Sequence, residues 1–332
     1  MNSRIYNNLL TAIRENIPSD VNLTNYLCDV LNIGRESAYR RIRGEINFTF
    51  DEVSILSQSL GFSIDNIIGV IRGSNVLYNI HMLQKLDHID IYVNKMHEYA
   101  RLFRETSQQM QTKVRISINT LPYFFHINYE ALSKFRIYKW LYQNQKVGPA
   151  EKYTDFTLPE KVWNAHKRLY QDIQMIKNVT VIMDNDVFWS MAKEIEYFYK
   201  RGLIVDGDLE ALKNELLELV NTLEEWATKG VNKNGTKISM YISAVDLEAS
   251  YMHYEYGTEQ FSQVKIFSIS AIDSFDADLC KVQKEWIESL KRYSVLISES
   301  GEMQRFDYMN RQRDYISRLN NVEIHSSINK FE

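Results

Sequence analysis

The chain has 332 residues, 45% of them hydrophobic and 25% charged, a composition that excludes long disordered segments and suggests two globular domains. The formal net charge of −4 excludes a generally basic protein that coats phosphates, so any attraction to nucleic acid must be local. Two cysteines far apart in sequence, Cys28 and Cys280, together with the lack of an apolar leader or of a bilayer-length apolar stretch, predict a cytoplasmic protein with no membrane partner.

The first two helices are predicted by apolar residues at helical spacing. One apolar face covers residues 5–13, and Pro18 ends that helix. Asn22 is a favourable N-cap for the second helix, whose apolar face covers residues 23–31.

A tight turn and a short third helix follow. Asn32 tolerates the left-handed backbone that such a turn needs, and Gly34 opens the helix. Ala38 is small enough for close packing against the second helix. Helix, turn and helix in this order place a recognition helix, here residues 34–43, in the major groove of DNA.

Positive charge is concentrated on this third helix. Residues 1–73 contain seven Arg and no Lys against eight Asp and Glu, a net charge of −1, yet four of the seven Arg lie between residues 35 and 43. Arg can bond guanine or phosphate, Tyr can stack or bond to phosphate, and Glu can accept from cytosine. A nearly neutral domain with so local a positive patch is expected to bind DNA as a homodimer. The residues expected to contact DNA are Thr24, Arg35, Glu36, Ser37, Tyr39, Arg40, Arg43 and Asn47.

Two more helices are expected to complete this domain. Gly44 stands in the usual position past the end of the recognition helix. Residues 49–52, Thr-Phe-Asp-Glu, form a capping box for a fourth helix that ends at Gly61. Ser63 is expected to cap a short fifth helix over residues 64–68.

Four features carry a resemblance to a known family. Cys28 stands at a position that the family buries, Leu31-Asn32-Ile33 at its turn, Arg43-Gly44 at the end of its recognition helix, and residues 60–65 at its leucine-glycine stretch before the last helix. On these grounds residues 5–71, about a fifth of the chain, resemble a helix-turn-helix DNA-binding domain of the phage-repressor or Cro type.

Two positions depart from the family pattern. Asn32 replaces the usual turn glycine, and Thr24 stands where the family often has a phosphate-binding glutamine. Asn tolerates the turn backbone and Thr can still donate to phosphate, so both changes are permissive. The resemblance implies that residues 1–72 bind DNA. The alternative is a small helical bundle whose Arg face docks a protein partner.

A second, larger domain is expected over residues 76–332, after a linker at residues 72–75, with 76–230 and 236–320 as candidate subdomains. Residues 76–111 show helical spacing without Gly or Pro. This helix could form the seam of a dimer, because half-site recognition needs two DNA-binding domains at a fixed distance. It could equally pack on its own domain.

The remaining pattern changes from helical to alternating near residue 230. Helices are predicted at residues 132–142, 158–176, 187–201, 209–227, about 276–293, and after Gly301. Strands are predicted at residues 238–242, within 251–256, within 264–269, and at 295–297. We therefore expect a mainly α protein, with a five-helix helix-turn-helix domain and a larger, α-rich α+β domain that contains a small antiparallel sheet.

Seven aromatic residues of the second domain are candidates for lining a ligand pocket, with the hydrophobic core as the alternative. They are Tyr123, Phe124, Phe125, Trp140, Tyr251, Tyr254 and Tyr256. A glycine-rich phosphate loop, a dinucleotide fingerprint and metal-ligand spacing are not found in the sequence. We therefore expect no catalytic activity, no cofactor and no metal.

The main hypothesis is a dimeric, ligand-responsive transcription regulator. Double-stranded DNA is its expected partner, and its larger domain would bind a small-molecule or protein effector. The alternative hypothesis is a protein-interaction scaffold whose small domain docks a protein partner. A third is an effector enzyme tethered to DNA, which would need convergent carboxylates in a polar pocket of the larger domain.

Overall fold

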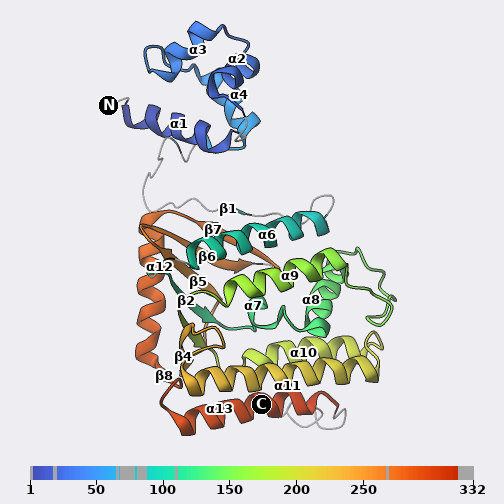
Figure 1. The fold of residues 1–332 in the computed structure, drawn as a ribbon. Coiled ribbons are helices and arrows are strands. Elements are labelled where there is room, and N and C mark those ends of the chain that lie inside the picture. The colour runs from blue at the N-terminus through green and yellow to red at the C-terminus, as the bar shows by residue number, and fades with distance from the viewer. Residues whose placement is uncertain are drawn as a thin grey trace, which may run out of the picture. The chain divides into compact units, whose positions relative to one another are not determined.

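The computed structural model describes residues 3–17, 21–64, 67, 79–80, 88–107, 109, 111–266 and 269–320. The chain divides into two compact units, Met1–Leu77 and Tyr78–Glu332 (Figure 1). The expected linker at residues 72–75 lies outside the described residues.

The first unit is built from short helices around one small core. They are α1 (Ser3–Asn16), α2 (Leu23–Leu31), α3 (Arg35–Ile42) and α4 (Phe50–Leu60). The core comprises Leu9, Leu10, Ile13, Leu27, Ala38, Phe48, Leu56 and Ile67. These residues come from every helix of the unit, so each helix buries its apolar stripe against the others. The expected fifth helix at residues 64–68 lies largely outside the described residues.

Local signals set the ends of these helices as predicted. The Asn22 side chain accepts hydrogen bonds from the backbone N–H groups of Thr24 and Asn25, at 2.9 and 3.4 Å. Asn32 is left-handed, with φ 51° and ψ 48°. Both bonds of the Thr49–Glu52 capping box are present. The helix-turn-helix geometry of residues 23–42 therefore follows from caps and turn residues that the sequence contains.

An eight-stranded mixed sheet organises the second unit. Its strand order is β1-β7-β6-β5-β2-β3-β4-β8. The three strands β2, β3 and β4 are parallel and lie side by side in chain order, while the other pairs are antiparallel. The strands are β1 (Asn79–Ile80), β2 (Lys113–Ile118), β3 (Asn178–Met183), β4 (Lys237–Ser243), β5 (Tyr251–Tyr256), β6 (Glu259–Ile266), β7 (Ser270–Ser274) and β8 (Ser294–Leu296).

Helices cover both faces of this sheet (Figure 1). One face packs on α12, where Ile182 of β3 meets Ile287 and Leu290. The neighbouring strand residues Val181 and Met183 point to the opposite face and belong to the main core. The helices are α6 (His88–Ser107), α7 (Tyr123–His126), α8 (Glu130–Gln143), α9 (Glu160–Ile173), α10 (Val187–Lys200), α11 (Asp206–Lys229), α12 (Ala277–Leu290) and α13 (Glu302–Ser317).

The expected fold class is wrong in its description of the sheet. A mainly α protein was expected, whose larger, α-rich α+β domain contains a small antiparallel sheet. The second unit instead contains a mixed sheet of eight strands, so the protein is α+β. The strands β2 and β3 were not predicted, although both show the alternation of a strand, as in Val114, Ile116 and Ile118. The sheet joins strands from both sides of residues 230–236, so the candidate subdomains form one unit.

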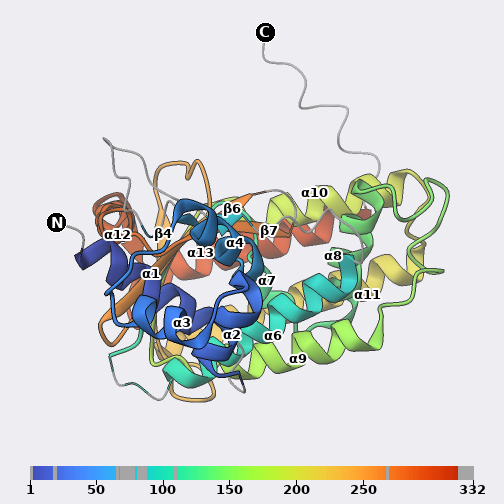
Figure 2. The ribbon, with the colours of Figure 1, turned by 90° about the horizontal axis from the view of Figure 1, so that it is seen from above.

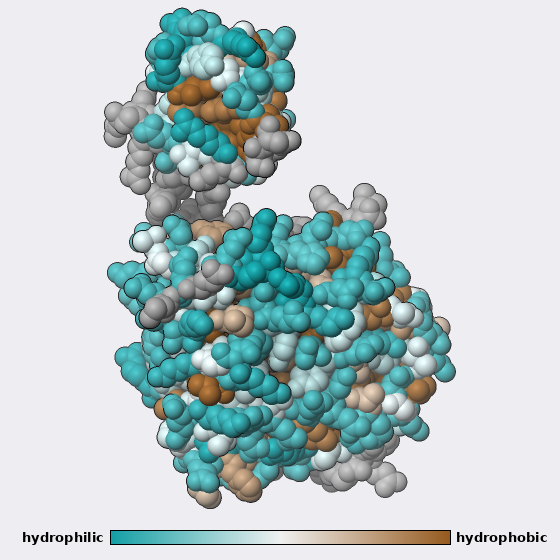
Figure 3. Space-filling view, viewed as in Figure 1, coloured by the Kyte–Doolittle hydropathy of each residue, from teal (hydrophilic) through white to brown (hydrophobic). Residues whose placement is uncertain are grey.

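Helix α6 packs on its own unit. Its apolar residues, among them Tyr92, Met96 and Phe103, are buried in the core, and Figures 1 and 2 both show it alongside α9. Residues 79–80, predicted as helix, form β1 instead. Within α6, the apolar face that could have formed a dimer seam is therefore occupied by the unit itself, apart from Ile91, which is 41% exposed. The face of the second unit drawn in Figure 3 is mostly hydrophilic, with hydrophobic residues in small scattered areas.

Among the described residues, no helix combines the length and the apolar character that crossing a bilayer requires.

Candidate nucleic-acid interface and an apolar pocket

One side of α3 presents polar side chains to solvent. Glu36, Tyr39, Arg40 and Arg43 have the spacing of a single helix face. Tyr39 is 49% exposed, and the side chains of Arg40 and Arg43 are 49% and 58% exposed. On the opposite side Ala38 is fully buried, which fixes the orientation of α3. The helix therefore carries two guanidinium groups and a phenol on a surface that can meet a partner.

The residues expected at the edges of this surface differ in their exposure. Arg35 is exposed, and its Nη2 donates to Asn25 Oδ1 of α2 at 3.1 Å. Asn47 is exposed in the loop that follows α3. Thr24, the expected phosphate contact, is only 7% exposed. The exposed polar side chain at this end of α2 is instead that of Asn25.

Arg41 is not part of the exposed face, because it forms an ion pair inside the unit. Its Nε and Nη2 donate to the two carboxylate oxygens of Glu52, at 3.1 and 2.7 Å. Its Nη1 donates to Ser37 Oγ at 2.6 Å. The hydroxyl of Ser37, which was expected to contact DNA, is therefore bonded within the unit. Burial alone would raise the pKa of Glu52, but hydrogen bonds from Arg41 and Thr49 lower it overall. The bidentate pair fastens α3 to the first turn of α4.

Replacing Glu52 with Gln is expected to destabilise the first unit by about 2 kcal/mol at pH 7, because Arg41 is left without its counter-charge. The lowered pKa gives stability that is present above the unfolded value of about 4.3 and is lost as pH falls through the folded value. The difference between the two proteins should therefore shrink below about pH 4.

Hydrogen exchange of the α4 amides, at pH 7 and again below about pH 4, measures this difference in stability. Glu45→Gln is the matched control, because the Glu45 side chain is 45% exposed. An equal loss of protection in both variants would mean that the Arg41 pair has no special role.

Glu45 contacts both exposed arginines. One carboxylate oxygen lies 3.5 Å from Arg40 Nε and the other 3.2 Å from Arg43 Nε. Glu36 Oε1 also lies 3.8 Å from Arg43 Nη2. Glu45 was not predicted as a site residue, although its position directly after Gly44 places it beside the end of α3. Two carboxylates therefore offset much of the positive charge of this face.

Tyr6 of α1 holds the end of α3 in place. Its hydroxyl lies 2.6 Å from the backbone oxygen of Arg41 and 3.0 Å from that of Ile46, and burial raises its pKa. Its ring stacks on Phe48 at a centroid distance of 5.8 Å. The chain reverses at Gly44, between the two carbonyl groups that Tyr6 bonds. The φ of Gly44 is 75°, a backbone conformation that favours glycine.

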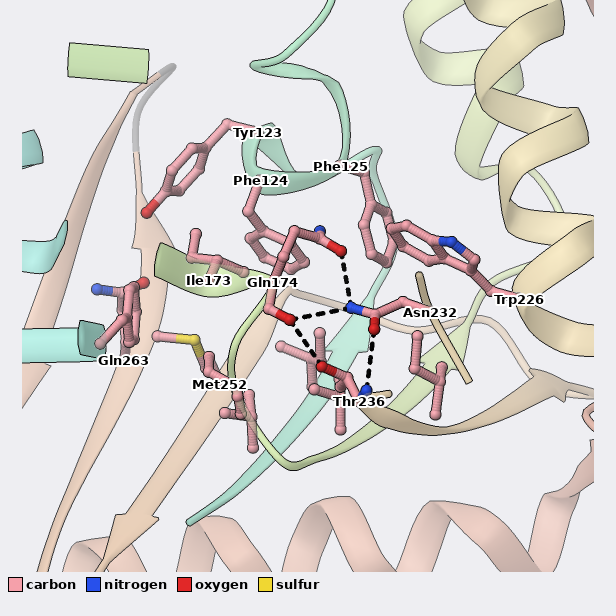
Figure 4. Close-up of a pocket in the computed structure, with 16 residues that line it drawn as sticks. Tyr123, Phe124, Phe125, Ile173, Gln174, Trp226, Asn232, Thr236, Met252 and Gln263 are labelled. Carbon is pink, nitrogen blue, oxygen red and sulfur yellow. Dashed lines mark hydrogen bonds between the residues drawn. The ribbon is translucent and has the colours of Figure 1, made fainter. Parts of the chain in front are cut away.

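The second unit contains an apolar pocket, shown in Figure 4. Its aromatic walls include Phe103, Tyr123, Phe124, Phe125 and Trp226. Three of its polar side chains are already bonded to one another. Asn232 Nδ2 donates to Gln174 Oε1 at 2.7 Å, and Thr236 Oγ1 donates to the Gln174 carbonyl at 2.8 Å. The indole Nε1 of Trp226 is buried and has no hydrogen-bond partner. The pocket therefore suits a mainly apolar group.

The seven candidate aromatic residues are divided between pockets and core. Tyr123 and Phe124 line the pocket of Figure 4 and a second pocket beside it, and Phe125 lines the first. Tyr251 lines the second. Trp140 and Tyr254 are core residues with 3% and 0% exposure, and Tyr256 packs against the core. Phe103 and Trp226 were missed, because they lie on helices far from the others in sequence.

A search of the described residues found no group of three or more His, Cys, Asp or Glu side chains placed to hold a metal ion. Comparisons with models of known families, with curated proteins and with solved structures found no match for this chain.

Proposed function

We propose that this protein is a sequence-specific DNA-binding transcription regulator, with α3 as the recognition helix in the major groove. The observation that carries the proposal is the capped helix-turn-helix whose third helix exposes Tyr39, Arg40 and Arg43. Arg can bond two acceptors of guanine at once, and a phenol can bond phosphate. Arg35 and Asn47 stand where they could contact the phosphate backbone on either side.

We propose further that two copies bind together. Residues 1–73 carry a net charge of −1, and Glu45 and Glu36 offset Arg40 and Arg43. One copy would therefore hold DNA weakly, while two linked copies would combine their binding free energies. Half-sites would lie one DNA turn apart, about 34 Å.

We place the protein in the cytoplasm and assign effector binding to its second unit. Cys28 and Cys280 are free thiols, as a reducing compartment would keep them. Adjoining pockets in the second unit offer apolar walls for a small molecule.

Selection of DNA from a random pool by the purified full-length protein tests this function. The expected result is one enriched sequence with two related halves about 10 base pairs apart. Sedimentation of the protein with that DNA should give two copies per duplex. A pool without any enriched sequence after repeated selection would contradict the proposal.

Glu45→Gln is expected to raise affinity for all DNA sequences by roughly 3- to 10-fold, because a carboxylate beside the phosphates is removed and two Arg are released. Stability should change by less than about 1 kcal/mol, since the Glu45 pairs are exposed. Affinity is measured at several salt concentrations by fluorescence anisotropy.

Glu36→Gln serves as the comparison for Glu45→Gln. If Glu36 accepts from a cytosine, its replacement should change preference at one base pair and leave non-specific binding nearly unaltered. An unchanged or lower affinity of Glu45→Gln would show that this carboxylate does not face DNA.

A second candidate function is a scaffold whose first unit docks a protein. It is favoured by the near neutrality of the exposed α3 face, and by Phe50, which is 75% exposed. If the protein is a scaffold, it should bind a protein partner in a fixed ratio, and replacing Tyr39 and Arg40 should abolish this binding. The DNA selection should then enrich no sequence.

A further inference from the structure

Arg136 of α8 is a buried cation without an acidic partner. It is 8% exposed, and its Nε makes no hydrogen bond. Its guanidinium lies over the Tyr123 ring, 4.8 Å from the centroid. None of the ion pairs found among the described residues includes it. Burying a guanidinium without a counter-charge costs free energy of folding. We therefore expect Arg136 to have a functional role.

The charged groups near Arg136 do not supply the missing anion. Lys265 shares two neighbouring pockets with it, and burial of the ammonium group together with the charges of Arg136 and Lys139 lowers the Lys265 pKa to about 8. The carboxylate of Glu194 is bonded to Lys139 at 2.6 Å. The carboxylate of Asp273 accepts from Tyr99 and Gln263, at 3.1 and 2.7 Å. The region is therefore positive overall.

The polar groups behind Arg136 form a neutral chain. His166 Nε2 lies 2.7 Å from Tyr92 OH, and His166 Nδ1 lies 3.0 Å from Ser133 Oγ, which donates to the Ile127 carbonyl. Burial and the charge of Arg136 lower the His166 pKa to about 3, so the imidazole is neutral at pH 7. The proton order that satisfies every group has Tyr92 donating to His166 and His166 donating to Ser133. These hydrogen-bonded groups are all neutral, so they leave the charge of Arg136 uncompensated.

The pocket that Arg136 and Lys265 share has apolar walls. They include Ile116, Ile118, Pro122, Phe124, Met252 and Ile269. The cavity volume is about 60 Å³. At roughly 10–15 Å³ for each water, the cavity has room for about four to six waters. We therefore consider acids with one ring or a short chain.

We propose that this pocket binds a small organic carboxylate with an apolar body, its carboxylate on Arg136 and Lys265 and its body against the aliphatic and aromatic wall. A carboxylate would supply the counter-charge that Arg136 lacks, because a guanidinium can bond both oxygens of a carboxylate, and the Lys265 ammonium group can donate to it as well. A phosphate ion has no apolar body to contact this wall, so it should bind more weakly than such an acid. The proposal rests on the effector-binding part of the proposed function, and its test contains no DNA, so either can fail without the other.

Isothermal titration of the full-length protein with phenylacetate, hexanoate and benzoate tests the proposal. Saturable binding of at least one acid is expected, with phenylacetamide and inorganic phosphate binding at least 10-fold more weakly. Arg136→Met should weaken binding of the acid by about 10- to 100-fold. Arg201→Met is the matched control, because Arg201 also stacks on a Tyr ring, that of Tyr197, but is exposed and does not line the pocket.

Lys265→Met is a second variant. Part of this side chain is exposed, although the ammonium group at its end is largely buried, so the variant should fold and should weaken binding of the acid several-fold even if Arg136→Met fails to fold. No saturable binding of any of the three acids at millimolar concentration would overturn the proposal. Equal binding of phenylacetamide, tighter binding of inorganic phosphate, or unchanged affinity in both pocket variants would also overturn it.

Discussion

Replacing Arg40 and Arg43 together with Ala is expected to lower the affinity for the selected DNA site by roughly a thousandfold. A direct Arg contact contributes about 1–3 kcal/mol, and a dimer would lose four of them. Even the lower value gives roughly 4 kcal/mol. The two side chains are about half exposed and Ala is a good helix former, so the first unit should stay folded. Fluorescence anisotropy across a salt series measures the effect.

The salt series also separates the two roles of these arginines. The slope of log affinity against log salt should decrease by roughly one for each Arg that neutralises a phosphate. Arg40→Lys with Arg43→Lys would keep the charge and the slope but lose discrimination between bases, because Lys lacks the planar fork. Arg14→Ala removes a charge from the exposed side of α1 and should change little. A double Ala variant with unaltered affinity would show that α3 is not the recognition helix.

Leu27→Ala is expected to unfold most of the first unit while the second unit stays folded. Leu27 is fully buried in the core that α1, α2 and α4 share. Truncating a buried Leu costs about 2–5 kcal/mol, and a core of this size rarely supplies more than about 3–5 kcal/mol. DNA binding should be lost with the fold, because α3 depends on this core for its orientation.

Two probes distinguish the units in this experiment. All five Trp lie after residue 77, so their fluorescence reports the second unit, while hydrogen exchange of α2 and α4 reports the first. Ile55→Ala, at a residue that is 45% exposed, is the control and should cost much less. Full protection of the α2 amides in Leu27→Ala would contradict the core that the structure describes. A simultaneous change in Trp fluorescence would show that the units fold together.

The helix-turn-helix was predictable because its signals are local. Asn22, Asn32 and the Thr49–Glu52 box act within four residues of themselves, through backbone hydrogen bonds or a single left-handed residue. The inward turn of Arg41 was not predictable in this way. The charge count included Arg41 in the local positive cluster, and Arg41 was not among the expected DNA contacts. Its partner Glu52 is eleven residues away, on another helix, so the pair could not be predicted from local signals.

The sheet also depends on contacts between residues far apart in sequence, which local signals do not predict. Strands β4, β5 and β8 were predicted from their alternation or short apolar runs. The strands β2 and β3 also alternate, but each is a short segment between helices, and its place in the sheet is set by parallel pairing across connections of about fifty to sixty residues. Pairing of this kind is decided by the packing of whole layers and not by the residues of one strand.

The sequence by itself determined where the helices of the first unit begin and end, how the chain turns between α2 and α3, and that positive charge gathers on α3. These properties depend on neighbours a few residues apart. Only the tertiary structure decided that Arg41 pairs with Glu52, that Glu45 lies against Arg40 and Arg43, and that Arg136 is buried without a carboxylate. Charge pairing and burial depend on groups that approach through space, and a single sequence does not contain those distances.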